Sequence, residues 1–330
     1  MTISKVLRNH PDIGEETKKR VLQRVKELNY QPNLAARSLI TGRTYTIGLV
    51  VPDLLHPFFA QIAKAITGAI RRKGYSLFLS SSDDDPTLER EEVAQLLARQ
   101  VDVMLVASAQ QALENQAQLE ERKIPLILLD RQFPGVESNF VGVDDTAVGT
   151  LATTHLIEQG CRRIAHIRGP EVSTAIGRVE GYKKALEAHQ IAPLPDGIVS
   201  IGSSGDHEGE KAGYEATSKL LAGPNRPDGI FCFNDPVAMG AMRAIFETGF
   251  RVPEDVAVVG CANLPYSDLL RVPLTSIDQN SNLIGETAAT LALKLAQSKT
   301  PVAPKRILVP PRIIVRASSL RQGNGMRAGS

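Results

Sequence analysis

Short polar segments follow the apolar runs of this 330-residue chain, and their side chains are of types that bind hydroxylated ligands. Carboxylates, amides and guanidinium groups make paired hydrogen bonds to neighbouring hydroxyls, and phenyl rings stack on the C–H faces of sugars. If each apolar run is a strand of a parallel sheet, the segments meet at its carboxyl edge, where such sheets bind ligands. The segments are Asp53 to Phe59, Asp83 to Asp85, Asp130 and Arg131, Asp144 and Asp145, Ser173 to Arg178, Asn234 and Asp235, and Ala262 and Asn263.

The apolar runs alternate with amphipathic helix patterns, which predicts parallel sheets covered by helices on both faces. In the first half, strands are expected at 46–53, 75–82, 101–108, 124–130 and 140–145, with helices at 58–73, 86–99 and 110–122. The rhythm then restarts, with helices at 146–159, 177–190, 208–222 and 236–248 and strands at 162–169, 197–201, 228–235 and 255–263. The final segments, 274–278, 282–297 and 306–318, are long enough to cross between lobes and complete both sheets. The expected fold class is therefore α/β, with two doubly wound lobes whose loops face each other.

Positive charge is concentrated near the N-terminus. Residues 1–44 hold nine Lys and Arg against four Asp and Glu, whereas the rest of the chain holds 29 against 32. A basic segment on a weakly acidic body is typical of a polyanion-binding head. A solvated helix face would give the same pattern, so charge alone leaves both interpretations open.

The basic segment carries the patterns of a small all-α head. From Glu15 to Leu28, apolar residues recur at helical spacing with Lys and Arg between them, which predicts a short amphipathic helix. Residues 1–8 have a second such pattern. Residues 33–40, after Pro32, form at most a marginal helix that is too short to be stable alone in water.

Composition excludes several classes of protein. No apolar run approaches the ~20 residues of a membrane span, and the start lacks a secretory signal, so we expect a cytoplasmic protein without a membrane partner. The three cysteines lack the spacing of a zinc or redox site, and no metal or cofactor is expected. The first strand is not followed by a glycine-rich phosphate-binding turn, and His166 lies within a strand pattern, so no enzymatic activity is expected.

The order of these parts resembles the lac repressor/galactose repressor family of transcription regulators. The matching segments are TISKVLRN, the stretch from Ile13 to Asp53, and HPFF, LLDR, GRVEGY, FCFNDPVAMGAM, VPEDVAVVG and PLTSIDQ, in the family's order and at compatible spacing. The resemblance implies a helix-turn-helix head, a hinge helix and a core of two lobes like those of periplasmic binding proteins. It further implies a repressor of carbohydrate genes that binds operator DNA as a homodimer and responds to a small effector.

For DNA binding, the resemblance implies a helix in the major groove and a hinge helix in the minor groove. The residues carried over to DNA contact are Thr2, Ser4, Lys5, Tyr30, Asn33, Ala36 and Leu39. Lys5 would reach the major groove, and Leu39 would wedge open a central base step, although it could also be an ordinary linker leucine.

The family's first helix and turn have no counterpart before Thr2. A recognition helix needs that first helix as a brace, so we expect impaired operator binding in this chain and specific binding in a product extended upstream. Either the start site lies further upstream or the chain is a truncated product.

The resemblance also carries over a set of effector contacts: Phe58, Phe59, Asp130, Arg131, Asp144, Ser173, Thr174, Arg178, Asn234, Asp235 and Asn263. Arg178, in the first turns of a helix behind a strand-end loop, is the strongest single candidate. Asp144 has an alternative role as the cap of the helix that starts near Thr146.

Many relatives have an acceptor aspartate where this chain has Ala262. Without that carboxylate, Arg131 and Arg178 would leave the site more positive. The sequence therefore favours an acidic sugar or a sugar phosphate over a simple neutral sugar, unless Asp130 or Asp144 already pairs with a guanidinium.

The sequence thus predicts four parts along the chain. They are a partial helix-turn-helix head at 1–32, a hinge helix and linker at 33–44, a core at 45–318 and a disordered tail at 319–330. Within the core we expect an N-lobe of about 45–145 and 277–297 and a C-lobe of about 146–276 and 305–318. The alternative, a periplasmic sugar-binding protein without DNA-binding activity, would need an export signal and no basic head.

Overall fold

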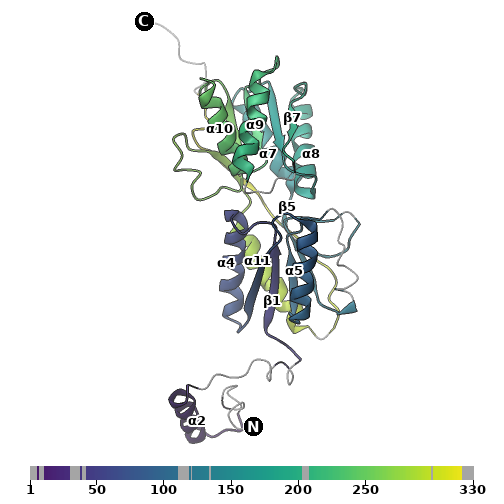
Figure 1. Ribbon diagram of the computed structural model, residues 1–330, viewed down its shortest axis with the longest axis vertical. Helices are drawn as coiled ribbons and strands as arrows, with labels where there is room; N and C mark the ends of the chain where they lie inside the picture. The colour runs from purple at the N-terminus through teal and green to yellow at the C-terminus, as the bar shows by residue number, and fades with distance from the viewer. Residues whose placement is uncertain are drawn as a thin grey trace. The chain divides into compact units, whose positions relative to one another are not determined.

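The computed structural model divides the chain into two compact units, residues 1–45 and 46–330 (Figure 1). It describes residues 6, 11–29, 38, 42–110, 119, 121–133, 135–202, 208–298 and 300–321.

In the first unit, the predicted amphipathic helix is confirmed as α2 (Glu15–Glu27). Glutamates in its first turn and Arg24 and Lys26 in its last turn complement the helix dipole. None of its residues is buried. The residues predicted to contact DNA, Thr2, Ser4, Lys5, Tyr30, Asn33, Ala36 and Leu39, lie outside the described part of the chain.

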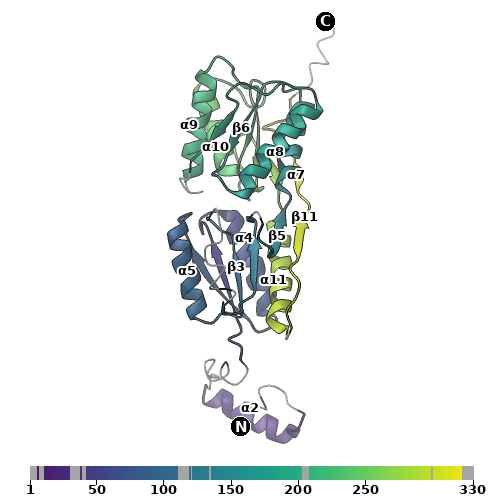
Figure 2. The same ribbon diagram turned by 90° about the vertical axis from the view of Figure 1, so that its right-hand side faces the viewer.

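The N-lobe is a parallel sheet between helices. Its described strands run in the order β11 (Arg306–Val309), β5 (Asn139–Val143), β4 (Leu126–Leu129), β3 (Val103–Val106), β1 (Thr46–Val51) and β2 (Ser76–Ser81). Two helices, α4 (Pro57–Arg71) and α11 (Ser281–Gln297), pack against each other, and α5 (Pro86–Ala98) lies apart from them (Figure 2). Every residue of β3 is buried, as expected for a strand covered on both faces.

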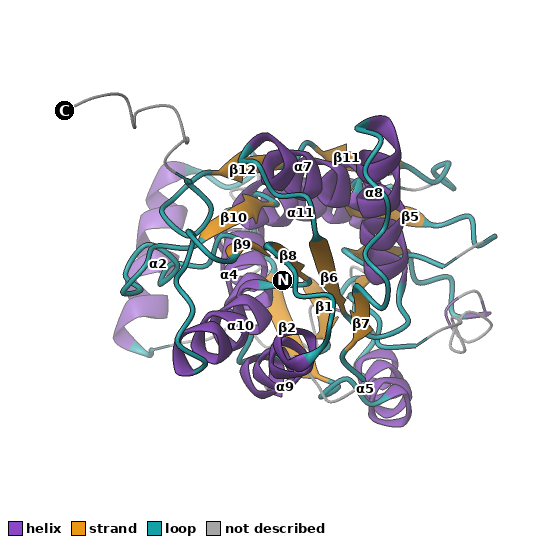
Figure 3. Cartoon of the chain, turned by 90° about the horizontal axis from the view of Figure 1, so that it is seen from above, coloured by secondary structure: helices purple, strands orange, loops and turns teal. Residues whose placement is uncertain are grey.

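The C-lobe repeats this plan. Its described strands run in the order β12 (Arg312–Ile314), β10 (Thr275–Asp278), β9 (Ala257–Cys261), β8 (Gly229–Cys232), β6 (Ile164–Arg168) and β7 (Ile198–Ser200), with β12 antiparallel to β10. Its helices pack in two pairs, α7 (Asp145–Glu158) with α8 (Ser173–Ala188), and α9 (Gly209–Ala222) with α10 (Asp235–Glu247). In the view from above, α7 and α8 lie on one side of β6 and β8, and α9 and α10 lie on the other (Figure 3).

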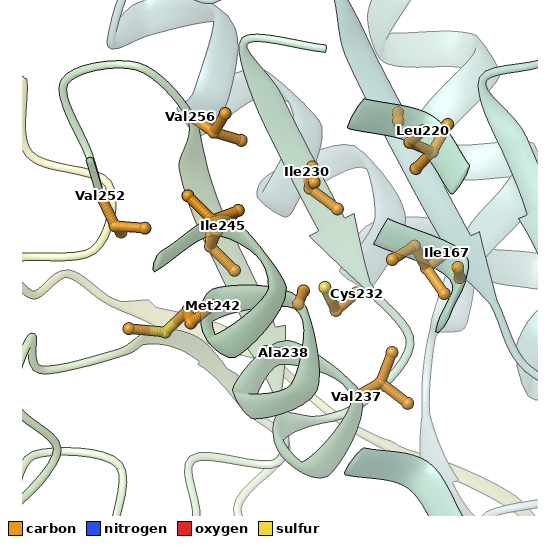
Figure 4. Packing of buried hydrophobic residues seen from close by; sticks show 14 of the residues in the cluster. Ile167, Leu220, Ile230, Cys232, Val237, Ala238, Met242, Ile245, Val252 and Val256 are labelled. Atoms are coloured by element: carbon orange, nitrogen blue, oxygen red, sulfur yellow. The ribbon is translucent and has the colours of Figure 1, made fainter. Parts of the chain in front are cut away.

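Apolar residues on one side of α10 form the C-lobe core. Val237, Ala238 and Ile245 belong to a buried cluster with Ile230 and Cys232 of β8, and Figure 4 shows these side chains together. Burial raises the pKa of the Cys232 thiol, which fits the predicted role of a small buried hydrophobe.

The structure differs from the predicted lobe boundaries in the last segment. The sequence places 305–318 in the C-lobe, but β11 pairs with β5 in the N-lobe sheet, and only after Pro310 and Pro311 does the chain enter the C-lobe sheet as β12. Proline has no N–H group to donate to a neighbouring strand, so Pro310 and Pro311 end β11 before the chain crosses to the C-lobe sheet.

Two other boundaries move. Helix α8 starts at Ser173, earlier than the predicted start at 177. The sequence pattern missed this first turn because its small and β-branched residues have a low helix propensity. The expected disordered tail starts too early, since Ser319 is buried and Arg321 donates hydrogen bonds to the carbonyl groups of Pro253 and Asp228. The helix predicted at 110–122 falls mostly outside the described residues. Within the described part, each helix is too short or too polar to span a bilayer.

Candidate ligand-binding site

Side chains after the strands cap the helices that follow. A capping side chain accepts hydrogen bonds from N–H groups that have no partner within the helix. Asp144 accepts from the N–H groups of Thr146 and Ala147 at 3.0 and 3.2 Å and is exposed, so the structure places it in the capping role. Asn234 caps α10 by accepting from the Val237 N–H at 3.0 Å.

Asp235 is fully buried, and three groups of its own lobe donate hydrogen bonds to its carboxylate. Oδ2 accepts from the Leu264 N–H at 2.7 Å and the Ser267 hydroxyl at 2.8 Å, and Oδ1 accepts from the Ser276 hydroxyl at 2.6 Å. Burial raises the pKa of Asp235 to about 6, while these hydrogen bonds and the nearby His56 lower it. The carboxylate thus joins the start of α10 to the segment after β9 and to β10.

Arg178 is 3% exposed and held in one orientation. Its Nε donates to Oδ1 of Asp145 at 3.0 Å, Nη1 donates to the Phe233 carbonyl at 2.6 Å, and the guanidinium lies 4.7 Å from the centre of the Phe233 ring. Nη2 has no partner among the described residues, so its N–H groups can donate to a ligand. Burial raises the pKa of Asp145, Arg178 lowers it, and the charge on Asp130 raises it again.

Arg131 is paired in a similar way in the N-lobe. Its Nη1 lies 3.1 Å from Oδ1 of Asp84 and donates to the Ser108 carbonyl at 3.1 Å. The side chains of Arg131 and Asp84 are 6% and 12% exposed. Both candidate guanidinium groups therefore already have an acidic partner.

Aromatic and hydroxyl side chains complete the candidate set. Phe58 and Phe59, in the first turn of α4, are each 3% exposed and meet edge to face with centres 5.2 Å apart. Ser173 and Thr174 lie in the first turn of α8 rather than in a loop, and the Ser173 hydroxyl accepts from the Gln132 N–H at 3.0 Å.

Asp130 and Asn263 lie at strand ends with left-handed backbone conformations, at φ 59° and 48°. Asp130 accepts from the side-chain amide of Gln279 at 3.4 Å, and Asn263 accepts from Arg316 at 2.7 Å. Ala262 has φ 110°, a conformation that alanine adopts with strain.

Buried carboxyl groups outnumber buried guanidinium groups at the two sheet edges. Among the described residues, Asp53, Asp84, Glu89, Asp130, Asp145 and Asp235 are each at most 12% exposed, and the buried guanidinium groups beside them are those of Arg131 and Arg178. Asp84 and Asp145, rather than Asp130 or Asp144, pair with the two guanidinium groups, and the charge of the effector stays a prediction.

Sequence reasoning missed several features of this site. Asp145 follows its strand as expected, but its partner Arg178 lies 33 positions away and no local pattern links them. Gln279 follows a strand end and could have been found by the same rule as the others. Glu89 lies inside a helix pattern, where nothing marks it as buried.

Comparison with known proteins decides the family. A model described as bacterial regulatory proteins, lacI family, matches residues 1–33, and one described as a periplasmic binding protein-like domain matches residues 153–319. The ribose operon repressor of Halalkalibacterium halodurans is 34% identical over 319 residues, which cover 96% of this chain and 92% of the relative. The chain belongs to the lacI family of bacterial regulatory proteins.

Two further relatives of this lacI-family protein agree with that result. The HTH-type transcriptional repressor PurR of Escherichia coli O139:H28 is 35% identical over 322 residues, covering 96% of this chain and 92% of the relative. The crystal structure of the lac repressor dimer bound to operator and the anti-inducer ONPF has a TM-score of 0.84 and 27% identity, covering 97% of this chain and 95% of that one.

The predicted family and fold class are therefore confirmed. The chain is a DNA-binding transcription regulator with a small-molecule-sensing core, and the periplasmic alternative is not favoured, because the lacI-family match includes its basic N-terminal segment.

Proposed function

We propose that the core of this regulator binds a neutral, polyhydroxylated effector, such as a monosaccharide, and that Arg178 is its main polar anchor. The observation that carries the proposal is the buried Arg178–Asp145 pair. It leaves the N–H groups of Nη2 available, while Asp145 offsets the positive charge of the guanidinium. A neutral hydroxylated ligand can accept from these N–H groups of the guanidinium fork, whereas an anion would have to approach an edge that carries several buried carboxylates.

The other contacts that we propose come from both lobes. They are Phe58, Phe59, Asp130, Arg131, Ser173, Thr174 and Asn263. The phenyl rings would cover the C–H face of a sugar, and the polar groups would fix its hydroxyls. We assign Asp144, Asn234 and Asp235 to the structure of the site, because their side chains are engaged by helix N–H groups or by their own lobe.

At the level of the whole protein, we propose a cytoplasmic repressor, without enzymatic activity, that acts as a homodimer on operator DNA. The names of the relatives, a ribose operon repressor and a lac repressor dimer bound to operator, support this proposal. The basic charge of residues 1–44 suits a phosphate backbone.

Calorimetry on the purified chain tests the effector class. D-ribose, the sugar in one relative's name, should bind more tightly than D-ribose 5-phosphate. Arg178→Lys should weaken D-ribose binding by about 10- to 100-fold, because an ammonium group cannot reproduce the fork. Tighter binding of the phosphate would overturn the proposal of a neutral ligand.

Fluorescence anisotropy with DNA from upstream of the gene tests the regulator. Affinity should fall steeply between about 50 and 200 mM salt and should change when the effector is added. Sedimentation should show a dimer at micromolar concentration. A stable monomer, or an affinity for DNA that is independent of salt, would contradict the assignment.

A further inference from the structure

One buried carboxylate outside the candidate contacts binds the segment that follows β3. Glu89, in the first turn of α5, is fully buried. Its Oε1 accepts from the Ser108 hydroxyl at 2.6 Å and from the Gln110 side-chain amide at 2.8 Å, and its Oε2 accepts from the Ala109 N–H at 2.5 Å. A single side chain thus binds three consecutive residues of the segment that follows β3.

The chemistry of these partners requires a carboxylate. All three partners act as donors, and an ionised carboxylate only accepts. Burial raises the pKa of Glu89, and the hydrogen bonds from Ser108 and Ala109, together with Arg131, lower it. A buried charge is tolerated when it is paired and hydrogen-bonded in this way, and removing a single partner is costly.

The same segment sets the position of Arg131. The Ser108 carbonyl accepts from Nη1 of Arg131, and that nitrogen also pairs with Asp84. Ser108 thus contacts Glu89 through its hydroxyl and Arg131 through its carbonyl. A shift of the segment would move an acceptor of the Arg131 guanidinium.

We propose that Glu89 is a positioning residue for effector binding, which acts through Ser108 to fix the guanidinium of Arg131. The inference rests on the proposed function, because Arg131 is one of the contacts proposed there. Glu89 itself does not touch the ligand.

The test measures D-ribose affinity by calorimetry on the full chain in a double-mutant cycle. Glu89→Gln keeps the shape of the side chain but places its NH2 group, which is a donor, next to the donor groups of Ser108, Ala109 or Gln110. It should weaken D-ribose binding about 10-fold in the parent and less than about 2-fold in a chain that already carries Arg131→Lys. Ser108→Ala, which removes the hydroxyl and keeps the carbonyl, should give a smaller loss with the same dependence on Arg131. Glu91→Gln, an exposed glutamate on the same helix, is the matched control and should change nothing.

Each other outcome overturns the proposal. Equal losses for Glu89→Gln in the parent and in the chain with Arg131→Lys would mean a general structural role. Unchanged D-ribose affinity in Glu89→Gln would mean that Glu89 has no role in binding. If that variant does not fold, the loss of affinity in Ser108→Ala, with and without Arg131→Lys, decides instead. A parent chain that binds D-ribose 5-phosphate more tightly than D-ribose would overturn the proposed function first, and this inference with it.

Discussion

Replacing Asp235 with Asn distinguishes a structural carboxylate from a ligand contact. The sequence predicts Asp235 as an effector contact, yet its three hydrogen-bond partners all belong to the C-lobe. The asparagine oxygen can replace Oδ2 and keep the Leu264 N–H and the Ser267 hydroxyl. Its NH2 group then faces Ser276, whose oxygen already accepts from the Asn263 N–H at 2.9 Å.

The variant should therefore lose one charge-assisted hydrogen bond and leave the Ser276 hydroxyl proton without its acceptor. Hydrogen bonds to charged groups contribute about 1.5–3 kcal/mol, so Asp235→Asn should lower the free energy of unfolding by about 2 kcal/mol at pH 7. D-ribose affinity should change less than about 2-fold, because Nη2 of Arg178 is untouched.

The pH dependence gives a second check with a defined sign. Burial raises the pKa of Asp235 from 3.8 to about 6, so the folded state binds the proton more tightly than the unfolded state. The contribution of protonated Asp235 to the free energy of unfolding is fully present below pH 4 and is lost as the pH rises through 6. This contribution is about 3 kcal/mol, at ~1.4 kcal/mol per pKa unit. The advantage of the parent over Asp235→Asn should therefore grow as the pH falls from 6 to 4.

Urea unfolding followed by circular dichroism measures both effects, and calorimetry measures the affinity. The urea midpoints of parent and variant are compared only where the unfolding free energy has the same slope against urea concentration. A difference in slope would indicate unfolding in more than one step, which a two-lobed core can show. A variant with unchanged stability and a 10-fold weaker D-ribose affinity would refute the structural assignment of Asp235 and restore it as a ligand contact.

Three further substitutions test the fold around the site. Gly149→Ala places a Cβ 2.2 Å from the Arg178 carbonyl oxygen, so it should separate α7 from α8, lower the free energy of unfolding by about 3 kcal/mol in urea titrations and weaken D-ribose binding. Ala262→Gly should relieve the backbone strain at φ 110°, which should raise the free energy of unfolding by about 1 kcal/mol and with it the thermal midpoint. Burial lowers the pKa of His166 from 6.5 to about 4, so its stabilising effect is present above pH 6.5 and is lost as the pH falls toward 4; His166→Gln should reduce that acid sensitivity in urea titrations.

Local patterns predicted the elements of the core well. Strands such as β1 and β8 are continuous apolar runs, and α7 and α10 lie within a few residues of their expected ranges. The pattern could not assign β11 to a sheet, because an apolar run followed by two prolines fits either lobe equally. The sheet that a strand joins depends on which sheet edge is free to pair with it, and that is set by the whole fold.

The site was harder to predict because one residue type serves two purposes at the same place. Asp or Asn after a parallel strand can cap the next helix or face a ligand, and Asp144 and Asn234 are caps. The ion pairs that set the charge of the site join residues 33 and 47 positions apart, Asp145 with Arg178 and Asp84 with Arg131. Such pairs follow from the topology, so a prediction based on unpaired arginines could not anticipate them.

The distribution of these contacts bears on how a neutral ligand could act as a switch. Each strong ion pair lies within one lobe, Arg131 with Asp84 and Arg178 with Asp145. Among the described residues, hydrogen bonds from Gln279 to the Asp130 carboxylate at 3.4 Å and from the Gln132 N–H to the Ser173 hydroxyl at 3.0 Å join segments of the two lobes. A neutral hydrogen bond contributes about 0.5–1.5 kcal/mol and one to a charged group about 1.5–3 kcal/mol, so we expect a ligand whose hydroxyls replace these bonds to shift the lobes while both ion pairs stay intact. A charged ligand would instead compete with the ion pairs, whose rupture within a buried site costs far more.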